Sequence, residues 1–257
     1  MITFGCIGCG NMGSAILGGL ESQKNVSLIG YDPSGNVPCT ACDTNIELAK
    51  QADIIMLATK PDYVESVLEA IQPALSEDKV IISIAAGVSM ETLIKCSGGK
   101  CPVVRCMPNT PAMVGEGIFA FCFEDPALTE KQQTTVLTMF EQLGQVMVLP
   151  EAKFNAFTAI AGCGPAYVLY FIEAVTEAAV SVGFHRNEAT EMAINLFKGT
   201  TKLADDSDLH ISQLREMVCS PAGVTIAAVN HMDRTAVRGN IIDSIFEARD
   251  RGIEMSK

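Results

Sequence analysis

Three glycines near the N-terminus follow a short apolar run and precede a helical pattern. The run ITFGCI has the composition of a β-strand, and the following SAILGGLES carries apolar residues at helical spacing. In a strand–turn–helix of this kind, the first glycine permits the tight turn, the second lets a diphosphate approach the backbone, and the third lets helix pack on strand. The N-terminus of the helix would bind the anion. The predicted dinucleotide-binding residues are Gly8, Cys9, Gly10, Asn11, Met12 and Gly13.

Asp32 ends the second predicted strand, VSLIGYD, where a carboxylate can accept hydrogen bonds from ribose hydroxyls. This role would favour NADH over NADPH, and no Arg or Lys follows until Lys50 to bind a 2′-phosphate. The alternative is that Asp32 only caps the DPSG turn. Residues 32–39 are also too few for the usual second crossover helix. We expect a nicotinamide cofactor, NADH or NADPH, and favour NADH.

A second unusual segment, CSPAGVT at 219–225, interrupts a helical region. Proline cannot continue a helix from the preceding turn but suits the first position of a new one. Ser220 and Pro221 are therefore predicted as N-cap and first residue of a helix that runs to Asp233. Gly223 would leave room for a close approach, and Thr225 would place a hydroxyl one turn into the helix. The alternative is a plain corner between two helices.

Three further motifs each follow a predicted strand: ATKP at 58–61, SIAAGVS at 83–89 and MPNTPA at 107–112. In an open parallel sheet, the loops beyond the carboxyl ends of the strands form the ligand crevice. Each motif alone could be ordinary turn chemistry. Their occurrence on one sheet edge favours a binding role.

The elements that must position these motifs change character near residue 150. Strands and helices alternate up to that point, and several strands are continuous apolar runs, as in a parallel sheet covered on both faces. Residues 1–150 are predicted to form an α/β Rossmann-like, doubly wound domain with a mainly parallel sheet. Residues 151–257 are predicted to form an all-α domain for substrate binding and dimerisation. Its expected helices are 151–183, 187–204, 210–218, 223–233 and 235–253.

The composition limits the class of protein. The net charge is −12 and neither half of the chain is basic, which argues against nucleic-acid binding. Hydrophobic residues make up 48%, enough for a packed core. The ten cysteines include two C-x-x-C pairs at 6–9 and 39–42, which could suggest a metal site. Buried thiols in a reducing compartment explain them better, and we expect no metal.

The expected location is the cytoplasm, since the N-terminus has no basic region followed by an uninterrupted apolar segment. Residues 154–172 carry no charge and are long enough to span a membrane. The Gly-Cys-Gly-Pro run at 162–165 and Glu173 just beyond predict instead a broken helix buried in protein. No membrane association is expected.

The motifs occur in the order and spacing of one known family. GCGNMG, KP, SIAAGVS, MPNTPA, AGCGPAY at 161–167 and SPAGVT at 220–225 resemble pyrroline-5-carboxylate reductase, an enzyme that makes proline. The resemblance covers nearly the whole chain, and the last two motifs are its most specific part. The family usually has Ser at the place of Cys163 and commonly Gly at that of Ala222. These differences and the shortened second crossover affect how the adenosine end of the dinucleotide and the SPAGVT segment at 220–225 are expected to fit their ligands, rather than the reaction.

The resemblance implies NAD(P)H-dependent reduction of the C=N bond of 1-pyrroline-5-carboxylate to L-proline, the last step of proline biosynthesis. The substrate carboxylate would accept hydrogen bonds from the amides of Gly223 and Val224, next to Ser220. Thr225 would orient the ring nitrogen and relay a proton. Subunits are expected to form homodimers, and the resemblance suggests rings of dimers up to a decamer. The remaining cofactor residues implied are Asn45 at the adenosine ribose, with Ala58, Thr59, Lys60, Pro61, Met107, Pro108 and Asn109 in the crevice.

Two other functions remain open from the residues. A hydroxyacid dehydrogenase of the 6-phosphogluconate type shares the architecture, including the C-terminal helical arrangement, but needs a Lys that residues 162–173 lack. An imine reductase that acts on a different substrate belongs to the same class of alternative. A non-catalytic NAD(H)-sensing protein would keep the glycines but would not need SPAGVT.

Overall fold

The computed structural model describes residues 1–255, which form two compact units. The first contains Met1–Cys163 and the C-terminal segment that begins at Ala248, and the second contains Gly164–Glu247. The strand–helix alternation ends close to residue 150, but the first unit continues beyond it because Phe154 and Phe157 are buried in its core.

An eight-stranded sheet forms the centre of the first unit, in the order β3-β2-β1-β4-β5-β6-β7-β8. Every neighbouring pair is parallel except β6–β7, which confirms the predicted mainly parallel Rossmann-like fold. The second crossover is short, since residues 32–39 join β2 to β3 without a helix in this described segment. The strands are β1 Ile2–Ile7, β2 Val26–Tyr31, β3 Thr40–Ala41, β4 Ile54–Leu57, β5 Val80–Ser83, β6 Val103–Met107, β7 Gly117–Cys122 and β8 Gly144–Val148.

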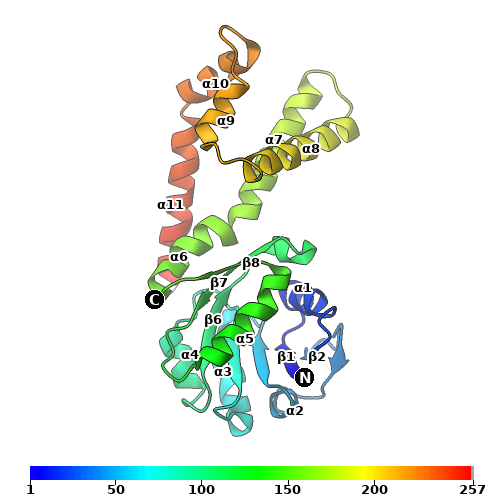
Figure 1. The fold of residues 1–257 in the computed structure, drawn as a ribbon, viewed down its shortest axis with the longest axis vertical. Coiled ribbons are helices and arrows are strands. Elements are labelled where there is room, and N and C mark those ends of the chain that lie inside the picture. Colours follow the sequence, from blue (N-terminus) through cyan, green and yellow to red (C-terminus); the bar gives the residue numbers. More distant parts are fainter. Residues whose placement is uncertain (256–257) are drawn as a thin grey trace. The chain divides into compact units, whose positions relative to one another are not determined.

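Helices cover both faces of this sheet (Figure 1). Helices α1 and α5 bury their apolar residues on one face, whereas α2, α3 and α4 bury theirs on the other. Strand β4 is apolar throughout because both of its faces are buried. Ile54 and Met56 pack in the core beneath α1 and α5, whereas Ile55 and Leu57 pack in the core beneath α2, α3 and α4. The helices are α1 Asn11–Leu20, α2 Asn45–Gln51, α3 Pro61–Ile71, α4 Met90–Cys96, α5 Glu130–Phe140 and α6 Phe154–Phe157. The 3-10 turns are Gln72–Ala74, Thr110–Val114, Glu141–Leu143 and Glu151–Lys153.

The second unit is helical throughout its described residues, as the sequence predicts. Its elements are α7 Gly164–Ser181, α8 Arg186–Asp205, α9 Ile211–Met217, α10 Val224–Arg234 and the first part of α11 Val237–Met255. Within Gly164–Glu247, only Thr176, Ala189 and Ala193 are buried. A unit with so small a core cannot offset the entropy of ordering its own backbone, so it needs another surface to cover it.

The uncharged segment at 154–172 lies in an interrupted helical run. A π-helical turn, Thr158–Gly162, separates α6 from α7, so the helix is broken as predicted. The prediction that it is buried in protein is wrong for the single chain, because only 6% of the most apolar window in Glu151–Ser181 is buried. By length and composition this run could also cross a membrane.

Candidate functional site

The glycine-rich turn between β1 and α1 has the geometry that the motif predicts. Gly8 has a φ of +96°, and a Cβ there would lie 2.6 Å from the carbonyl oxygen of Ala58. A Cβ at Gly13 would collide with the carbonyl oxygen of Gly8. A Cβ at Gly10, by contrast, would meet no atom within 4 Å. Two glycines are therefore required for the fold, while the third leaves open space at the N-cap of α1, where a phosphate can approach.

Asp32 holds this turn from the neighbouring strand. Its Oδ2 accepts a hydrogen bond of 2.8 Å from the amide of Cys9, and its Oδ1 accepts from the amide and hydroxyl of Ser34 at 2.9 and 2.6 Å. The bonds from Ser34, followed by that from Cys9, lower the pKa of Asp32 below its ordinary value. Asp32 is therefore a carboxylate at neutral pH. It caps the DPSG turn, one of the two roles considered above, and also fixes the glycine-rich turn.

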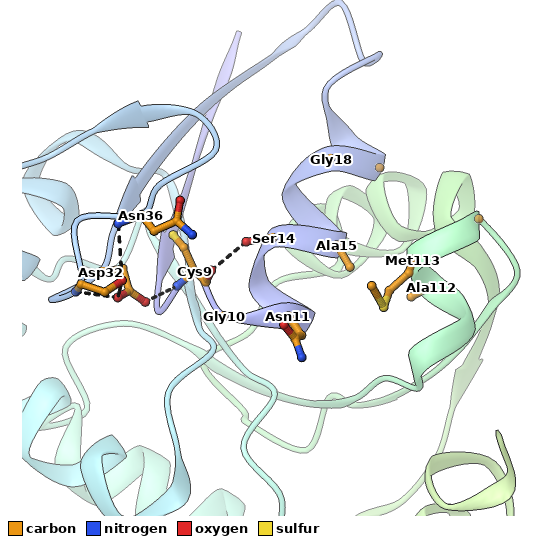
Figure 2. A pocket seen from close by; sticks show the side chains of 13 residues that line it. Cys9, Gly10, Asn11, Ser14, Ala15, Gly18, Asp32, Asn36, Ala112 and Met113 are labelled. Carbon is orange, nitrogen blue, oxygen red and sulfur yellow. Dashed lines mark hydrogen bonds between the residues drawn. The ribbon is translucent and has the colours of Figure 1, made fainter. Parts of the chain in front are cut away.

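A cavity of about 740 Å³ opens over the start of α1 (Figure 2). Figure 2 shows Asp32 directed at the backbone of Cys9, and Asn11 at the first turn of α1. The wall of this cavity includes no Lys or Arg among the residues that the structure describes. The lining residues are Cys9, Gly10, Asn11, Ser14, Ala15, Gly18, Gly19, Asp32, Ser34, Asn36, Ala112, Met113 and Gly115.

Nine of these lining residues lie outside the predicted cofactor residues, among them Ser14, Ser34, Asn36 and Met113. The hydroxyl of Ser14 donates a 2.7 Å hydrogen bond to the carbonyl oxygen of Cys9 and so braces the turn. Ser34 and Asn36 belong to the turn after Asp32, so the shortened crossover was the available signal. Met113 directly follows the MPNTPA motif.

Two buried polar atoms support a bound group at the same sheet edge. Oδ1 of Asn45, at the start of α2, and Oγ1 of Thr59, after β4, are buried without a hydrogen-bond partner among the described residues. A buried polar atom left in this state costs about 1–3 kcal/mol. Both residues are predicted cofactor contacts. The open space at Gly10 and these two unpaired acceptors therefore fit a dinucleotide carried on this edge.

The loop after β4 lies directly beside the glycine-rich turn. The amide of Ala58 bonds the carbonyl oxygen of Ile7 at 2.8 Å, and the Ala58 carbonyl abuts Gly8. Lys60 is the N-cap of α3 and Pro61 its first residue. This loop does not line the cavity, but it shares the carboxyl edge of the sheet with it.

The loop after β6 is placed by Asn109, whose side chain is used inside the protein. Its Oδ1 accepts from the amide of Ile118 at 2.9 Å, and its Nδ2 donates to the carbonyl oxygen of Ala161 at 3.1 Å. Asn109 is 5% exposed. Met107 ends β6 beside the π-helical turn, since a Cβ at Gly162 would lie 3.0 Å from its Cε. The Asn109 side chain therefore fixes loop position, and Met107, Pro108 and Asn109 remain outside the cavity wall.

The predicted start of the helix at Ser220 is wrong. Helix α10 begins at Val224, with Gly223 as its N-cap. Residues 220–223 instead form a turn in which the amide of Gly223 bonds the carbonyl oxygen of Ser220 at 3.0 Å. Proline at the second position and a positive φ of 57° at Ala222, the third, are the features of a type II turn.

This turn changes which amides could bind an anion. The amide of Gly223 is used within the turn, contrary to the prediction that it is free for a carboxylate. The first bond at the start of α10 runs from the amide of Ala227 to the carbonyl oxygen of Gly223. The amides of Val224, Thr225 and Ile226 precede it and point out of the helix end. Because a Cβ at Gly223 would collide with the Ser220 hydroxyl, the glycine also lets that side chain pack against the turn.

Thr225 is exposed in the first turn of α10, and Val224 is 90% exposed. Within residues 1–255, no hydrogen bond engages the Thr225 hydroxyl. A positive helix end, free amides and a free hydroxyl thus occur together in the second unit. This combination can bind a small carboxylate and a neighbouring polar atom.

Comparison with family models matches both parts of the chain. Residues 151–255 match the model described as pyrroline-5-carboxylate reductase dimerisation. Residues 3–87 match the model described as NADP oxidoreductase, coenzyme F420-dependent. The first match begins where the strand–helix alternation ends.

Curated relatives and solved structures match over the full length. Pyrroline-5-carboxylate reductase from Escherichia coli is 34% identical over 264 aligned residues, covering 98% of both chains. The enzyme from Pisum sativum is 30% identical and covers 99% of this chain and 96% of its own. A crystal structure of Plasmodium falciparum pyrroline carboxylate reductase with NADP bound superposes with a TM-score of 0.93 at 32% identity, covering 100% of this chain and 98% of the other.

Proposed function

Because the chain belongs to the pyrroline-5-carboxylate reductase family, we propose that it reduces the C=N bond of 1-pyrroline-5-carboxylate to give L-proline with a nicotinamide cofactor. It is an oxidoreductase with a Rossmann-like cofactor domain. The observation that carries the substrate assignment is the start of α10, where unpaired amides and the Thr225 hydroxyl lie together.

The first unit holds the cofactor. Gly10 and the first turn of α1 bind the diphosphate, with Asp32 and Asn45 toward the adenosine end and Thr59 on the next loop of the same edge. When bound, the reduced nicotinamide supplies a hydride, which no side chain of the protein can supply. The protein's contribution is to fix the position of the cofactor and exclude competing orientations.

The second unit holds the substrate. The amides of Val224 and Thr225 donate to the substrate carboxylate at the positive end of α10, and the Ser220 turn presents that end. Specificity for a small cyclic imino acid then follows from the short spacing between these amides and the Thr225 hydroxyl.

Thr225 positions the imine nitrogen. Reduction of a C=N bond proceeds best on the protonated iminium, and the product nitrogen must finish protonated. A threonine hydroxyl is a weak acid, so its role is to accept a hydrogen bond from N–H and connect the nitrogen to water. Thr225 is therefore an orienting group with proton relay rather than a strong acid catalyst.

Substitution of Thr225 tests this assignment. Thr225→Ala should lower kcat at least tenfold while the dissociation constant for NADH stays within twofold of wild type, since the hydroxyl lies in the other unit from the glycine-rich turn. Thr225→Ser keeps the hydroxyl and should retain most of the rate. Equal losses of turnover and NADH affinity in Thr225→Ala would show that the assigned role is wrong or that the variant is misfolded.

The alternative enzymes and the binding protein predict other outcomes. A hydroxyacid dehydrogenase would oxidise a hydroxy acid in an assay with NAD(P)⁺, and a sensing protein would bind NADH without consuming it when pyrroline-5-carboxylate is added. Residues 162–173 contain no Lys to serve the first of these reactions.

NADH is the preferred cofactor in this proposal. Asp32 is ionised, and the described residues that line the cavity include no cation to balance a 2′-phosphate. Oδ2 of Asp32 accepts one hydrogen bond, from the amide of Cys9, and keeps capacity for a ribose hydroxyl. Asp32→Ala should lower kcat/KM for NADH at least tenfold more than that for NADPH. An unchanged ratio would leave Asp32 with its structural role alone.

The proposed assembly is a homodimer, with the family also suggesting a decamer of dimers, and the proposed location is the cytoplasm without membrane association. The chain carries a dimerisation domain. Tyr170 and Phe171 of α7 and Ile241 and Ile245 of α11 line a groove of about 540 Å³ in the second unit, where a partner would supply the missing core. Tyr170→Arg should shift the mass in light scattering toward monomer, whereas Lys202→Arg, on an exposed polar surface, should not.

A further inference from the structure

Three cysteines gather under the glycine-rich turn. Cys6 of β1 pairs in register with Gly30 of β2, which pairs with Ala41 of β3, so these positions share one face of the sheet. Cys39 lies two residues before Ala41 and therefore faces the same way. Cys9 reaches this face from the turn, and all three cysteines belong to or pack against the same core cluster.

Gly30 has no side chain, which lets two of these thiols and a methyl group of Val37 approach the same point on the sheet. A Cβ at Gly30 would lie 3.1 Å from Sγ of Cys9 and 3.1 Å from Sγ of Cys39. The two sulfurs are thus at most twice that distance apart, and Cγ1 of Val37 lies 2.6 Å from the same point. Rotation about the side-chain torsions, with displacement of the Val37 methyl group and a small shift of the segment just before the two-residue edge strand β3, would close this gap.

We propose that Cys9 and Cys39 form a reversible disulfide when the protein meets a peroxide, and that this bond switches off dinucleotide binding. The Cys9 thiolate attacks one oxygen of the peroxide and releases hydroxide, which becomes water, leaving a sulfenic acid. The sulfur of Cys39 then displaces the hydroxyl from that sulfenic acid. The Cys39 proton leaves with it as a second water, so two thiols and one hydrogen peroxide give one disulfide and two waters.

The surroundings of the two thiols suit this order of events. The hydrogen bond from Cys6 lowers the pKa of Cys9, so Cys9 has the more accessible thiolate. Cys9 also lines the cavity, although it is only 5% exposed, so a peroxide approaches it from the cavity side. Burial raises the pKa of Cys39 to about 11, so Cys39 is protonated and acts second. Cys6 is fully buried, and its pKa is raised, so it is the less available partner.

The disulfide would disturb the phosphate site directly. The amide of Cys9 is held by Asp32, and its carbonyl oxygen accepts from Ser14, so the position of Cys9 sets the turn next to Gly10. Drawing Cys9 toward β3 strains these bonds and moves the Gly10 backbone from the place where it meets a diphosphate. The inference rests on the dinucleotide site of the proposed function but not on the identity of the reduced substrate.

The test exposes fully reduced protein to hydrogen peroxide and measures NADPH binding by calorimetry, with peptide mapping under non-reducing conditions. Wild-type protein should lose at least tenfold in NADPH affinity, show a Cys9–Cys39 cross-linked peptide and recover after dithiothreitol. Prior addition of NADP⁺ should slow the loss, because the cofactor covers Cys9. Cys39→Ser should keep its affinity at the same dose.

Cys42→Ser is the matched control, since Cys42 belongs to the core on the opposite face of the sheet. It should behave like wild type. A Cys6–Cys9 peptide in place of Cys9–Cys39, or an equal loss of affinity in Cys39→Ser, would overturn the proposal. Should Cys39→Ser fold poorly by thermal melting, the cross-linked peptide in wild type decides alone. Because these readouts do not use pyrroline-5-carboxylate, a wrong substrate assignment would leave them unaffected.

Discussion

The glycine at the N-cap of α1 allows binding to be separated from folding. Gly10 has φ −68° and ψ −168°, angles that alanine adopts without strain, and its added Cβ would meet no protein atom within 4 Å. The free energy of unfolding should therefore change only through the weaker N-cap preference of alanine, a cost below about 1 kcal/mol. For a chain of this size, 1 kcal/mol corresponds to a melting-temperature shift of about 2–4 °C.

The same methyl group should affect NADPH binding much more. It occupies the space in which a diphosphate would contact the backbone at the start of α1, and at least one charge-assisted hydrogen bond would be lost. Such a bond contributes about 1.5–3 kcal/mol, which corresponds to about a 10- to 150-fold increase in the dissociation constant. Calorimetric titration of Gly10→Ala with NADPH, beside thermal melting without cofactor, measures both effects.

Gly13→Ala is the comparison variant. Its Cβ would collide with the carbonyl oxygen of Gly8, so both the melting temperature and NADPH affinity should fall. If Gly10→Ala bound NADPH as tightly as wild type, the diphosphate would not lie over Gly10 and the reasoning would be refuted. A large loss of melting temperature in Gly10→Ala would instead show that the space around Gly10 is not open.

Substitutions at three further positions test other parts of the structure. Because the pKa of Asp32 is lowered in the folded state, the contribution of its carboxylate to stability is present above about pH 4 and is lost as the pH falls below that value toward the folded-state pKa. Asp32→Asn should remove this part of the pH dependence in thermal melts. Identical acid profiles for the variant and the wild type would contradict this reasoning. Ala222 has a positive φ, so Ala222→Val should destabilise the protein by more than about 1 kcal/mol while Ala222→Gly should change stability by less than about 1 kcal/mol; denaturant titration measures both, and equal effects would argue against the left-handed conformation. Asn109→Ala leaves the amide of Ile118 and the carbonyl of Ala161 unpaired and should cost about 2–4 kcal/mol; a loss of under 1 kcal/mol in urea denaturation would show that water replaces the side chain.

The local patterns in the sequence were sufficient for most of the fold. Apolar runs such as Ile54–Leu57 indicated strands buried on both faces, and the glycines at 8, 10 and 13 indicated a strand–turn–helix, because these features depend on backbone sterics and burial over a few neighbouring residues. The short second crossover also followed from counting residues between Asp32 and Cys39.

The start of α10 could not be obtained in this way. Ser220-Pro221 satisfies the preferences both of a helix start and of a type II turn, and proline fixes the same φ in each. The choice lies in the φ of Ala222, a position where alanine gives no indication of a left-handed conformation. The helix therefore begins at Val224, and the amide of Gly223 is used within the turn.

The sequence by itself determined the order of elements, the parallel sheet and two candidate binding segments, the glycine-rich turn at 8–13 and SPAGVT at 220–225. Each of these is specified by residues adjacent in the chain. Only the tertiary structure decided that Asp32 holds the backbone of Cys9, that the Asn109 side chain is used internally, and that Gly30 leaves Cys9 and Cys39 within reach of each other. These contacts join residues that are far apart in the chain. Which residues meet depends on the register of the sheet and on positions such as Gly30 that have no side chain.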